Sequence, residues 1–402
     1  MRHLDYFFGI PVLHLCSLFR RRSLRPENPQ RIGLLFNPAL GDTLLASAAV
    51  EDVRALYPNA RLIVFVTKAN AVAAQLLPGV DAIEILPITR PLRAIAVLRQ
   101  ARLDMLLDFT AWQRTTAIYS MLSRAQFTMG FERARQHRHI GYEHTVPHRS
   151  DCHELENLRR FTQVLGAKAP HDPRLQIPSN TSSRHLLYPG QRYIVFHAWA
   201  SGSKSWMREW PTERWIELVQ RLKSPSRVFL LTGSPADESR CDALFQTLRN
   251  QGATVRILIG REGLAAIAGT LMQAEMLISV NTGILHLGAI LGVPTIALNG
   301  PTSAARWGAV GRCAVNVAPG DGSGAYLDLG FEYRGRTENV MAKITVDQVL
   351  EAVHTLLPDS AAHAERARES QREQESLASD SATSVELPAN ESQGQEAAAT
   401  SV

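Results

Sequence analysis

Three short segments of the chain combine a glycine with acidic, basic or hydroxyl side chains in patterns that can carry acid–base and phosphate chemistry. The first is Asn37-Pro-Ala-Leu-Gly-Asp-Thr43, which follows a continuous apolar run from Ile32 to Phe36. Gly41 allows a tight backbone turn, so Asp42 is expected at or near the start of a helix. A carboxylate in that place can accept a proton from an attacking hydroxyl, or it can simply cap the helix.

The second segment is Ser279-Val-Asn-Thr-Gly-Ile-Leu-His286, which also lies at the end of an apolar run. Thr282 and Gly283 are expected to begin a helix that continues to Leu291, and the backbone N–H groups at such a helix start bind phosphate groups. His286 would lie one turn further along and could donate a hydrogen bond to the same phosphate. The alternative is a buried histidine on an otherwise apolar helix, with no ligand.

The third segment runs from His197-Ala-Trp-Ala-Ser-Gly-Ser-Lys204 to Trp210-Pro211. A predicted strand ends here in a small loop that has a hydroxyl at Ser201 and two cations, Lys204 and Arg208. Loop amides and cations stabilise the negative charge of a diphosphate leaving group. A solvated surface loop is the alternative interpretation.

Buried strands that end where these segments begin would bring each segment to the edge of a sheet. Apolar runs predict strands at 32–36, 61–67, 82–86 and 103–109, with helical stretches at 43–56 and 69–77. The alternation returns with strands at 193–197, 227–231, 254–258, 276–280 and 295–298, and with helices at 212–222 and 237–250. Such alternation is typical of doubly wound parallel sheets, whose ligands bind at the carboxyl ends of the strands. The sequence therefore predicts an α/β protein with two Rossmann-like domains facing a central cleft.

Composition places the boundaries of these domains at residues 31–168 and 192–357. The stretch 169–191 between them is rich in Pro, Ser and Asn, as linkers are. Thr345-Val-Asp-Gln348 has the pattern of a capping box and is expected to begin a closing helix that ends before Pro358. The tail 358–402 is rich in Ala, Ser, Glu and Gln, which bury too little apolar surface to offset the entropy of ordering, so we expect it to be disordered.

Residues 1–30 form a separate N-terminal segment with an apolar run from Leu4 to Phe19, followed by Arg20, Arg21 and Arg22. The run is shorter than the ~20 residues of a spanning helix, and it has no small-residue cleavage site of a signal peptide. Gly9 and Pro11 also interrupt it. We expect an anchor that lies on the cytoplasmic membrane surface with a basic collar. A helix packed on the protein's own surface is the alternative.

The overall composition excludes several classes of protein. The chain has 402 residues, a net charge of +5 and 45 % apolar residues, which suits two globular domains without the concentrated basic patches of a nucleic-acid binder. Four scattered cysteines favour reduced thiols in the cytoplasm, and no metal-ligand spacing is visible, so neither a metal nor a cofactor is expected. Six arginines of the first domain could be ordinary surface or a bed for an anionic glycolipid: Arg90, Arg93, Arg124, Arg133, Arg135 and Arg138.

The order of the motifs resembles glycosyltransferase family 9, the heptosyltransferase family of lipopolysaccharide assembly. Gly-Asp follows the first strand, a cation-rich loop precedes Trp210-Pro211, and Thr232-Gly-Ser-Pro235 leads to Asn281-Thr-Gly-x-x-His286. The resemblance extends over residues 31 to 357. It also includes Met129-Gly-Phe131, His153-Glu154, Leu165-Gly166 and the run Gly-Val-Pro-Thr-Ile-Ala-Leu-Asn-Gly-Pro-Thr at 292–302.

This resemblance implies a GT-B fold, with an acceptor-binding first domain and a second domain that binds a nucleotide sugar. It further implies an inverting, metal-independent transfer of heptose from ADP-heptose to a lipopolysaccharide-type acceptor at the inner face of the cytoplasmic membrane. The family's general base falls on Asp42, and its phosphate-binding residues fall on Thr282, Gly283 and His286.

At two positions this sequence departs from the family's pattern. The family's loop lysine falls on Arg208, with Lys204 nearby, so either cation could bind the diphosphate. Where the family commonly has an aspartate that contacts the donor sugar, this chain has Asn281, which keeps hydrogen-bonding capacity but loses the charge. A sugar-nucleotide epimerase and a non-catalytic binding protein are the alternative functions.

Overall fold

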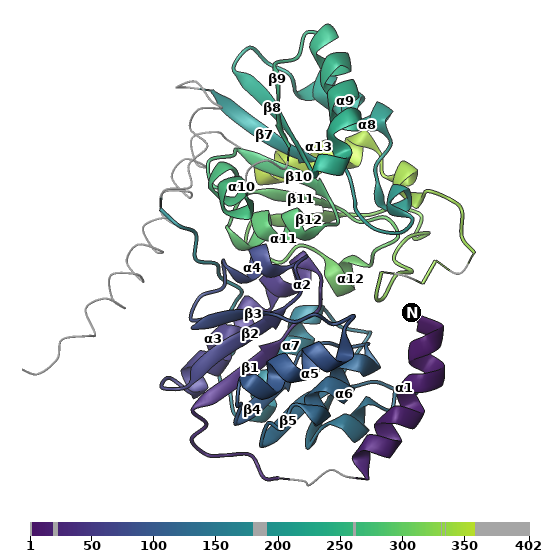
Figure 1. Cartoon of the computed structure of the whole chain (residues 1–402). Coiled ribbons are helices and arrows are strands. Elements are labelled where there is room, and N and C mark those ends of the chain that lie inside the picture. The colour runs from purple at the N-terminus through teal and green to yellow at the C-terminus, as the bar shows by residue number, and fades with distance from the viewer. Residues whose placement is uncertain are drawn as a thin grey trace, which may run out of the picture. The chain divides into compact units, whose positions relative to one another are not determined.

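Two parallel six-stranded sheets, each covered by helices, make up the computed structural model (Figure 1). The structure describes residues 2–18, 23–179, 191–259, 263–330, 332–333 and 335–357. The described residues up to Leu356 belong to one compact unit. The predicted disordered tail, 358–402, lies outside the described residues, as do Arg20, Arg21 and Arg22.

The first sheet has the strand order β3-β2-β1-β4-β5-β6. Its strands are β1 (Arg31–Leu35), β2 (Arg61–Val66), β3 (Ala82–Ile85), β4 (Met105–Asp108), β5 (Phe127–Glu132) and β6 (His144–Pro147). The helices of this domain are α2 (Leu40–Leu45), α3 (Ser47–Leu56), α4 (Ala71–Ala74), α5 (Pro91–Gln100), α6 (Arg114–Leu122) and α7 (Glu154–Leu165). Apolar side chains of β1, β2 and β4 are buried on both faces, which is why these strands read as continuous apolar runs.

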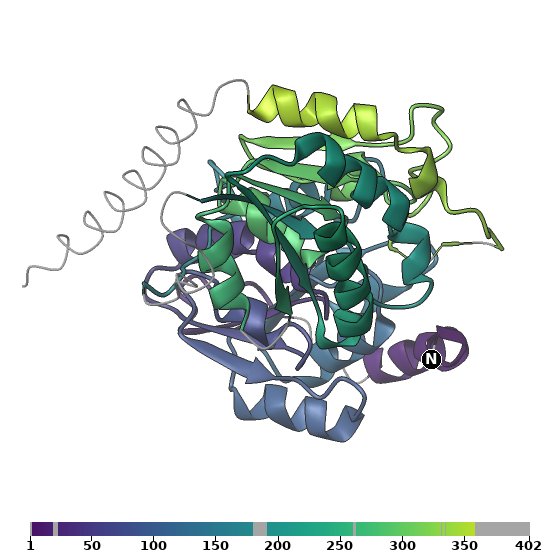
Figure 2. The ribbon, with the colours of Figure 1, turned by 90° about the horizontal axis from the view of Figure 1, so that it is seen from above.

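The second sheet repeats this topology, with the order β12-β11-β10-β7-β8-β9. Its strands are β7 (Arg192–His197), β8 (Arg227–Gly233), β9 (Val255–Ile259), β10 (Met276–Val280), β11 (Thr295–Leu298) and β12 (Ala314–Val317). Its helices are α8 (Thr212–Leu222), α9 (Glu238–Asn250), α10 (Leu264–Leu271), α11 (Gly283–Ile290), α12 (Ala304–Trp307) and α13 (Val346–Leu356). Figure 2 shows α13 along the outside of this sheet, where it packs on β11 and β12.

In both sheets the strand order reverses at one point, between β1 and β4 and between β7 and β10. Ligands of open α/β sheets bind beside such a reversal, at the carboxyl ends of the strands. Asp42 follows β1, the loop with Lys204 follows β7, and Thr282 follows β10. The predicted fold is therefore confirmed, and all three chemical segments lie beside a reversal of strand order.

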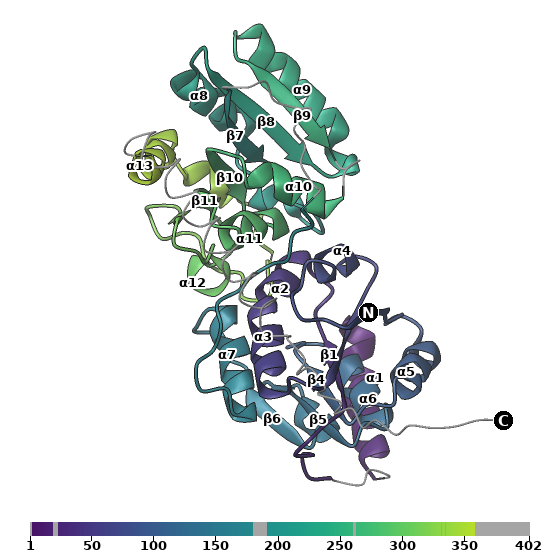
Figure 3. The ribbon, with the colours of Figure 1, turned by 90° about the vertical axis from the view of Figure 1, so that its left-hand side faces the viewer.

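The two domains meet where α2 packs against α11 (Figure 3). Two glycines permit this approach. A Cβ on Gly41 would lie 2.7 Å from the Cδ2 atom of His286, and a Cβ on Gly283 would lie 2.2 Å from a methyl carbon of Leu40. The predicted proton acceptor and the predicted phosphate-binding helix thus come from different domains and lie against each other.

Some predicted elements need correction. The helical stretch 43–56 is two helices, α2 and α3, which meet at Ala46, and the stretch 69–77 contains only the short helix α4. Helix α2 begins at Leu40 with Ala39 as its cap residue, so Asp42 lies in the first turn and the capping interpretation is wrong. The capping box at Thr345 is confirmed, because its hydroxyl accepts a bond from the Gln348 N–H and its own N–H donates to the Gln348 side chain.

The N-terminal segment forms helix α1 (Arg2–Ser17), which continues through Pro11 and packs on α6 and on the short 3₁₀-helix η1 (Arg138–Gly141). Leu13 is fully buried beside Ala117 and Tyr142. Leu15 and Leu18, by contrast, are 59 % and 77 % exposed. One face of α1 is thus packed on the protein's own surface while the other presents apolar side chains. Within the described residues, no helix has the length and apolar character to cross a bilayer.

Candidate active site

Asp42 lies in a small pocket at the carboxyl end of β1. The pocket is lined by Phe36, Asn37, Asp42, Ala46, Phe109, Glu154 and Leu158. The Nδ2 atom of Asn37 donates to Oδ1 of Asp42 at 3.1 Å. Aromatic and aliphatic walls with one amide donor can hold a carboxyl group in place, and Asp42 is partly buried among them.

This environment raises the pKa of Asp42 from 3.8 to about 7. The largest cause is burial, and the nearby negative charge of Glu154 adds to it. The hydrogen bond from Asn37 and the positive charge of Arg306 act in the opposite direction. A carboxylate with such a pKa is a good proton acceptor at neutral pH, because a general base works best when its pKa is near the working pH.

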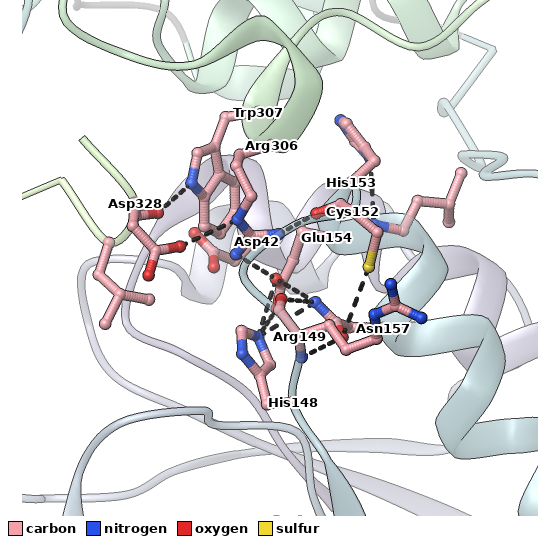
Figure 4. Close-up of polar contacts among 12 residues, drawn as sticks. Asp42, His148, Arg149, Cys152, His153, Glu154, Asn157, Arg306, Trp307 and Asp328 are labelled. Atoms are coloured by element: carbon pink, nitrogen blue, oxygen red, sulfur yellow. Dashed lines mark hydrogen bonds and ion pairs between the residues drawn. The ribbon is translucent and has the colours of Figure 1, made fainter. Parts of the chain in front are cut away.

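Glu154, the first residue of α7, is held by polar contacts from both domains (Figure 4). Nε2 of His148 lies 3.0 Å from a Glu154 carboxylate oxygen, and Nδ2 of Asn157 donates to the same oxygen at 3.1 Å. Arg306, from α12 of the second domain, donates to it at 3.1 Å. Burial alone would raise the pKa of Glu154, but the bond from His148 and the charge of Arg306 hold it below its usual value.

Arg306 is the centre of a group of interdomain contacts. Its Nε atom donates to Oδ1 of Asp328 at 2.9 Å, and Nη1 donates to the carbonyl oxygen of Cys152. Asp328 in turn accepts a bond from Arg133 of the first domain. We refer to Arg133, Glu154, Arg306 and Asp328 as the interdomain cluster.

The predicted phosphate-binding segment lies as expected at the end of β10. Thr282 is the cap residue of α11, which begins at Gly283, so backbone N–H groups are available at this helix start. The hydroxyl oxygen of Thr282 and Nδ1 of His286 are both buried and have no hydrogen-bond partner among the described residues. Burial lowers the pKa of His286 to about 3, and the charge of His153 contributes, so the imidazole is neutral and has one N–H to donate.

The loop with the two candidate cations follows β7, the strand next to β10. In the sheet, His197 is paired with Ser279, which places the loop beside the Thr282 turn. Lys204 adopts a left-handed backbone conformation, with φ 53°, and its Nζ atom lies 5.4 Å from the centre of the Tyr333 ring. Arg208 donates to the carbonyl oxygen of Ser201 through one nitrogen, while its buried Nε atom has no described partner. The structure thus shows one cation packed on a ring and the other folded over the loop.

A protein-family comparison identifies the chain. The model of glycosyltransferase family 9 (heptosyltransferase) matches residues 92–323, more than half of the sequence. The chain belongs to glycosyltransferase family 9. This confirms the resemblance that the motif order indicated.

Individual relatives place the chain within the family. Lipopolysaccharide heptosyltransferase 1 of Pseudomonas aeruginosa is 35 % identical over 130 residues, which is 32 % of this chain and 34 % of that protein. The matched segment therefore spans only about a third of that relative's length. Among solved structures, a family 9 glycosyltransferase from Veillonella parvula has a TM-score of 0.69 at 18 % identity, covering 84 % of this chain and 99 % of that one. The structure of E. coli ADP-heptose lps heptosyltransferase II has a TM-score of 0.67 at 19 % identity, with 81 % and 98 % covered. These similarities confirm the GT-B fold.

At the position where the family commonly has an aspartate, Asn281 makes contacts that an aspartate could not make. Its Nδ2 atom donates to Oδ1 of Asn299 and to the carbonyl oxygen of Trp307, both at 2.7 Å. A carboxylate has no hydrogen to donate to these two oxygens. The role of Asn281 toward the donor sugar stays a prediction, and the structure adds a link between this turn and α12.

The six arginines of the first domain do not share one environment. Arg138 is fully buried and bonded to Asp108 and Tyr142. For this residue, both the prediction of an ordinary solvated surface and the prediction of a glycolipid-binding surface are therefore wrong. Arg133 belongs to the interdomain cluster. Arg133 and Arg135 also line a cavity at the ends of β5 and β6, together with His137, His139 and His148. This cavity combines two arginines and three histidines with Glu132, and one of its lining residues, His148, bonds Glu154.

Proposed function

We propose that this protein is an inverting glycosyltransferase that moves heptose from ADP-heptose onto a hydroxyl group of a lipopolysaccharide-type acceptor. The observation that carries the proposal is the pKa of Asp42, about 7, in a pocket that lies against the helix start with the unpartnered Thr282 and His286. The name of the E. coli structural neighbour and the name of the Pseudomonas relative support ADP-heptose and lipopolysaccharide as substrate classes.

In the reaction, the acceptor hydroxyl approaches the anomeric carbon from the side opposite the diphosphate. Asp42 takes the hydroxyl proton as the new carbon–oxygen bond forms, and the bond from the anomeric carbon to the diphosphate oxygen breaks. Because the attack and the departure occur on opposite faces, the anomeric configuration inverts. The proton ends on Asp42 and the electron pair on the β-phosphate of the nucleoside diphosphate.

The negative charge on the departing diphosphate needs donors that are already in place. We assign this task to the backbone N–H groups at Thr282 and Gly283, the Thr282 hydroxyl, the neutral His286, and one of Lys204 and Arg208, with Ser201 in the same loop. Loss of a single preorganised donor of this kind typically costs ~10²–10³-fold in rate. The described residues contain no cluster of three or more His, Cys, Asp or Glu side chains that could hold a metal ion. We assign to protein donors and cations the role that a divalent ion has in other transferases.

For the acceptor, we propose that the first domain binds an anionic glycolipid at the inner face of the cytoplasmic membrane. The cavity lined by Arg133, Arg135 and His137 supplies positive charge for it. The exposed apolar side chains of Leu15 on α1 and of Leu18, which directly follows it, supply a face that can lie in the headgroup region.

The test is acceptor-dependent release of ADP. Purified protein is incubated with ADP-heptose, with and without a heptose-free lipopolysaccharide core, and both ADP and the mass of the acceptor are measured. We expect ADP release only with acceptor, together with the addition of one heptose to it, and we expect no loss of rate in EDTA. Isomerised donor without ADP release would indicate an epimerase instead, and binding of ADP-heptose without any product would indicate a non-catalytic protein.

A further inference from the structure

Arg306 is the one side chain of the interdomain cluster that contacts the first domain at two places while it is anchored in the second. Its side chain is 4 % exposed. Nη2 reaches Glu154 and Nη1 reaches the carbonyl oxygen of Cys152, both in the first domain, while Nε holds Asp328 of the second. A buried arginine with partners for all three nitrogens has a fixed position, and removal of any partner leaves charge unpaired.

Glu154 and Asp42 line the same small pocket, so the negative charge of each carboxylate disfavours ionisation of the other. Two nearby carboxylates in an apolar pocket disfavour ionisation of both unless a cation faces them. Figure 4 shows Arg306 reaching from α12 toward Glu154 and Asp42. Arg306 belongs to the second domain, so this cation stays beside the two carboxylates only while the domains are together.

The donor-binding turn is connected to the same place. Asn281, directly before the Thr282 turn, donates to the carbonyl oxygen of Trp307, the residue that follows Arg306. The Trp307 ring also lies 5.2 Å from the Arg306 guanidinium carbon, and its Nε1 donates to the Asp328 carbonyl oxygen. A ligand that orders this turn therefore acts on the backbone that carries Arg306.

We propose that Arg306 is a positioning residue that favours the ionised form of Asp42, and so makes it available as the base, in the assembled site. It brings a positive charge from the donor-binding domain to a carboxylate pair in the acceptor-binding domain. Without that charge, burial and the neighbouring Glu154 would keep the proton on Asp42, and attack by a hydroxyl would be suppressed. This inference rests on the proposed function, because it concerns the same base.

The other charged and titratable groups around Asp42 do not supply an equivalent switch. From α11 the neutral His286 faces Gly41, and His153 at the start of α7 bonds to the Gly308 carbonyl oxygen. His148 lies behind Glu154 in the same domain. On α3, Glu51 pairs with Arg174 and Asp52 with His171. Each of these groups except His286 belongs to the first domain, and His286 carries no charge.

The test compares pH profiles of kcat/KM for the wild type, Arg306→Met, Glu154→Gln and the double variant. In Arg306→Met the acidic limb is expected to move up by about one pH unit or more, since loss of a facing charge shifts a carboxyl pKa by roughly that amount. The rate deficit should be about tenfold at pH 6.5 and smaller at pH 9. Glu154→Gln should move the limb down, and adding it to Arg306→Met should bring the limb back.

Arg227→Met is the matched control, because Arg227 pairs with Glu275 within the second domain and contacts no residue of the pocket. It is expected to lower Tm without moving the limb. A purely structural Arg306 would reduce the rate by the same factor at every pH and would show no rescue by Glu154→Gln, and either result would overturn the inference. If Arg306→Met does not fold, Arg306→Lys and Glu154→Gln are measured instead. The acidic limb of the kcat/KM profile should stay at its wild-type pH in Arg306→Lys and move to lower pH in Glu154→Gln.

A second readout needs no turnover. The difference in Tm between each background and the same background with Asp42→Asn, followed against pH, reports the protonation of Asp42. We expect the pH at which this difference levels off to be higher in Arg306→Met than in wild type. An unchanged levelling pH contradicts the role of Arg306, whereas absence of heptose transfer by the wild type contradicts only the proposed function.

Discussion

The base side and the donor side of the site are built in different ways. Around Asp42 both carboxylates are engaged: Asn37 donates to Asp42, and Glu154 is bonded by His148, Asn157 and Arg306, although Nδ1 of His148 has no described partner. On the donor side, the hydroxyl of Thr282, Nδ1 of His286 and Nε of Arg208 are buried without a described partner.

This difference tells us which half of the site is complete in the protein alone. A buried polar atom without a partner costs ~1–3 kcal/mol, and three such atoms in segments that follow β7 and β10 are consistent with a ligand that supplies the missing partners. The base side needs no such ligand, since its protonation is set by protein groups. Substitutions on the two sides should therefore differ in how they change stability, binding and rate.

The largest effect is expected for Asp42→Asn. Asparagine keeps the size and the contact with Asn37 but cannot accept the proton, so turnover should fall by ~10²–10⁴-fold. Affinity for ADP-heptose should be nearly unchanged, because Asp42 is not among the diphosphate donors. Turnover, donor affinity and Tm are measured on one preparation. Asp52→Asn is the control: its carboxylate bonds Thr162 and His171 in the same domain, so it should lower Tm and retain turnover. Near-normal turnover in Asp42→Asn would remove it as the base.

On the donor side, Thr282→Val removes the unpartnered hydroxyl with little change in shape. Tm of the ligand-free protein should stay the same or rise, while ADP affinity should fall by roughly tenfold, the worth of one charge-assisted hydrogen bond. The measurement is the ADP-induced shift in Tm together with calorimetric affinity. Thr295→Val serves as the opposite case, since its hydroxyl already donates to the Val293 carbonyl oxygen at 2.7 Å. That variant should lose stability and keep ADP affinity, and the same behaviour in Thr282→Val would show that its hydroxyl is not part of the donor site.

The raised pKa of Asp42 also predicts a pH-dependent stability difference. The folded protein binds the Asp42 proton more tightly than the unfolded chain, with a pKa of about 7 against 3.8, so folding stability falls as pH rises through that window. Asn carries no such penalty. Asp42→Asn should thus be more stable than wild type by on the order of 4 kcal/mol above pH 7, with the difference vanishing as the pH falls below about 4. Parallel Tm curves across that range would mean that Asp42 titrates normally.

The sequence located the parts of the site that depend on local pattern. Asp42, Thr282 and the Lys204 loop each follow an apolar run, and the end of such a strand in a doubly wound sheet is a binding edge whatever the rest of the chain does. The cap residue of α11 and the capping box at Thr345 could also be predicted, because each depends on a short local sequence pattern. By contrast, β5 and β6 were not predicted, because Phe127–Glu132 and His144–Pro147 mix Thr, Gly, Glu and His with few apolar residues.

The interdomain cluster could not be predicted, because its partners are distant in the chain. Arg306 and Glu154 are 152 positions apart, and Arg133 and Asp328 are 195 apart. His153-Glu154 belonged to the motifs that resembled the family, but no local pattern assigned a role to Glu154. The packing of α7 on α3 brings Glu154 beside Asp42, and the packing of α2 on α11 holds the second domain, with Arg306, against the first. The split at Ala46 had no local signal either, since the residues on both sides are helix formers.

The smallest effect is expected where the two sides meet, at Asn281. Asn281→Asp replaces a donor to Asn299 and Trp307 with a carboxylate facing two acceptor oxygens, so some stability should be lost. If Asn281 also reaches the donor sugar, relative use of different sugar nucleotides should change by roughly tenfold or less, as one altered polar contact allows. Initial rates with a panel of nucleotide sugars measure this. Asn316→Asp is the comparison, because it loses a similar bond, to the Ala309 carbonyl oxygen, and lies one residue further from the donor turn, bonded to Asn299. Equal stability losses with an unchanged preference in both variants would limit Asn281 to holding Trp307, and through it Arg306, in place. A changed preference in Asn281→Asp alone would make it part of donor selection.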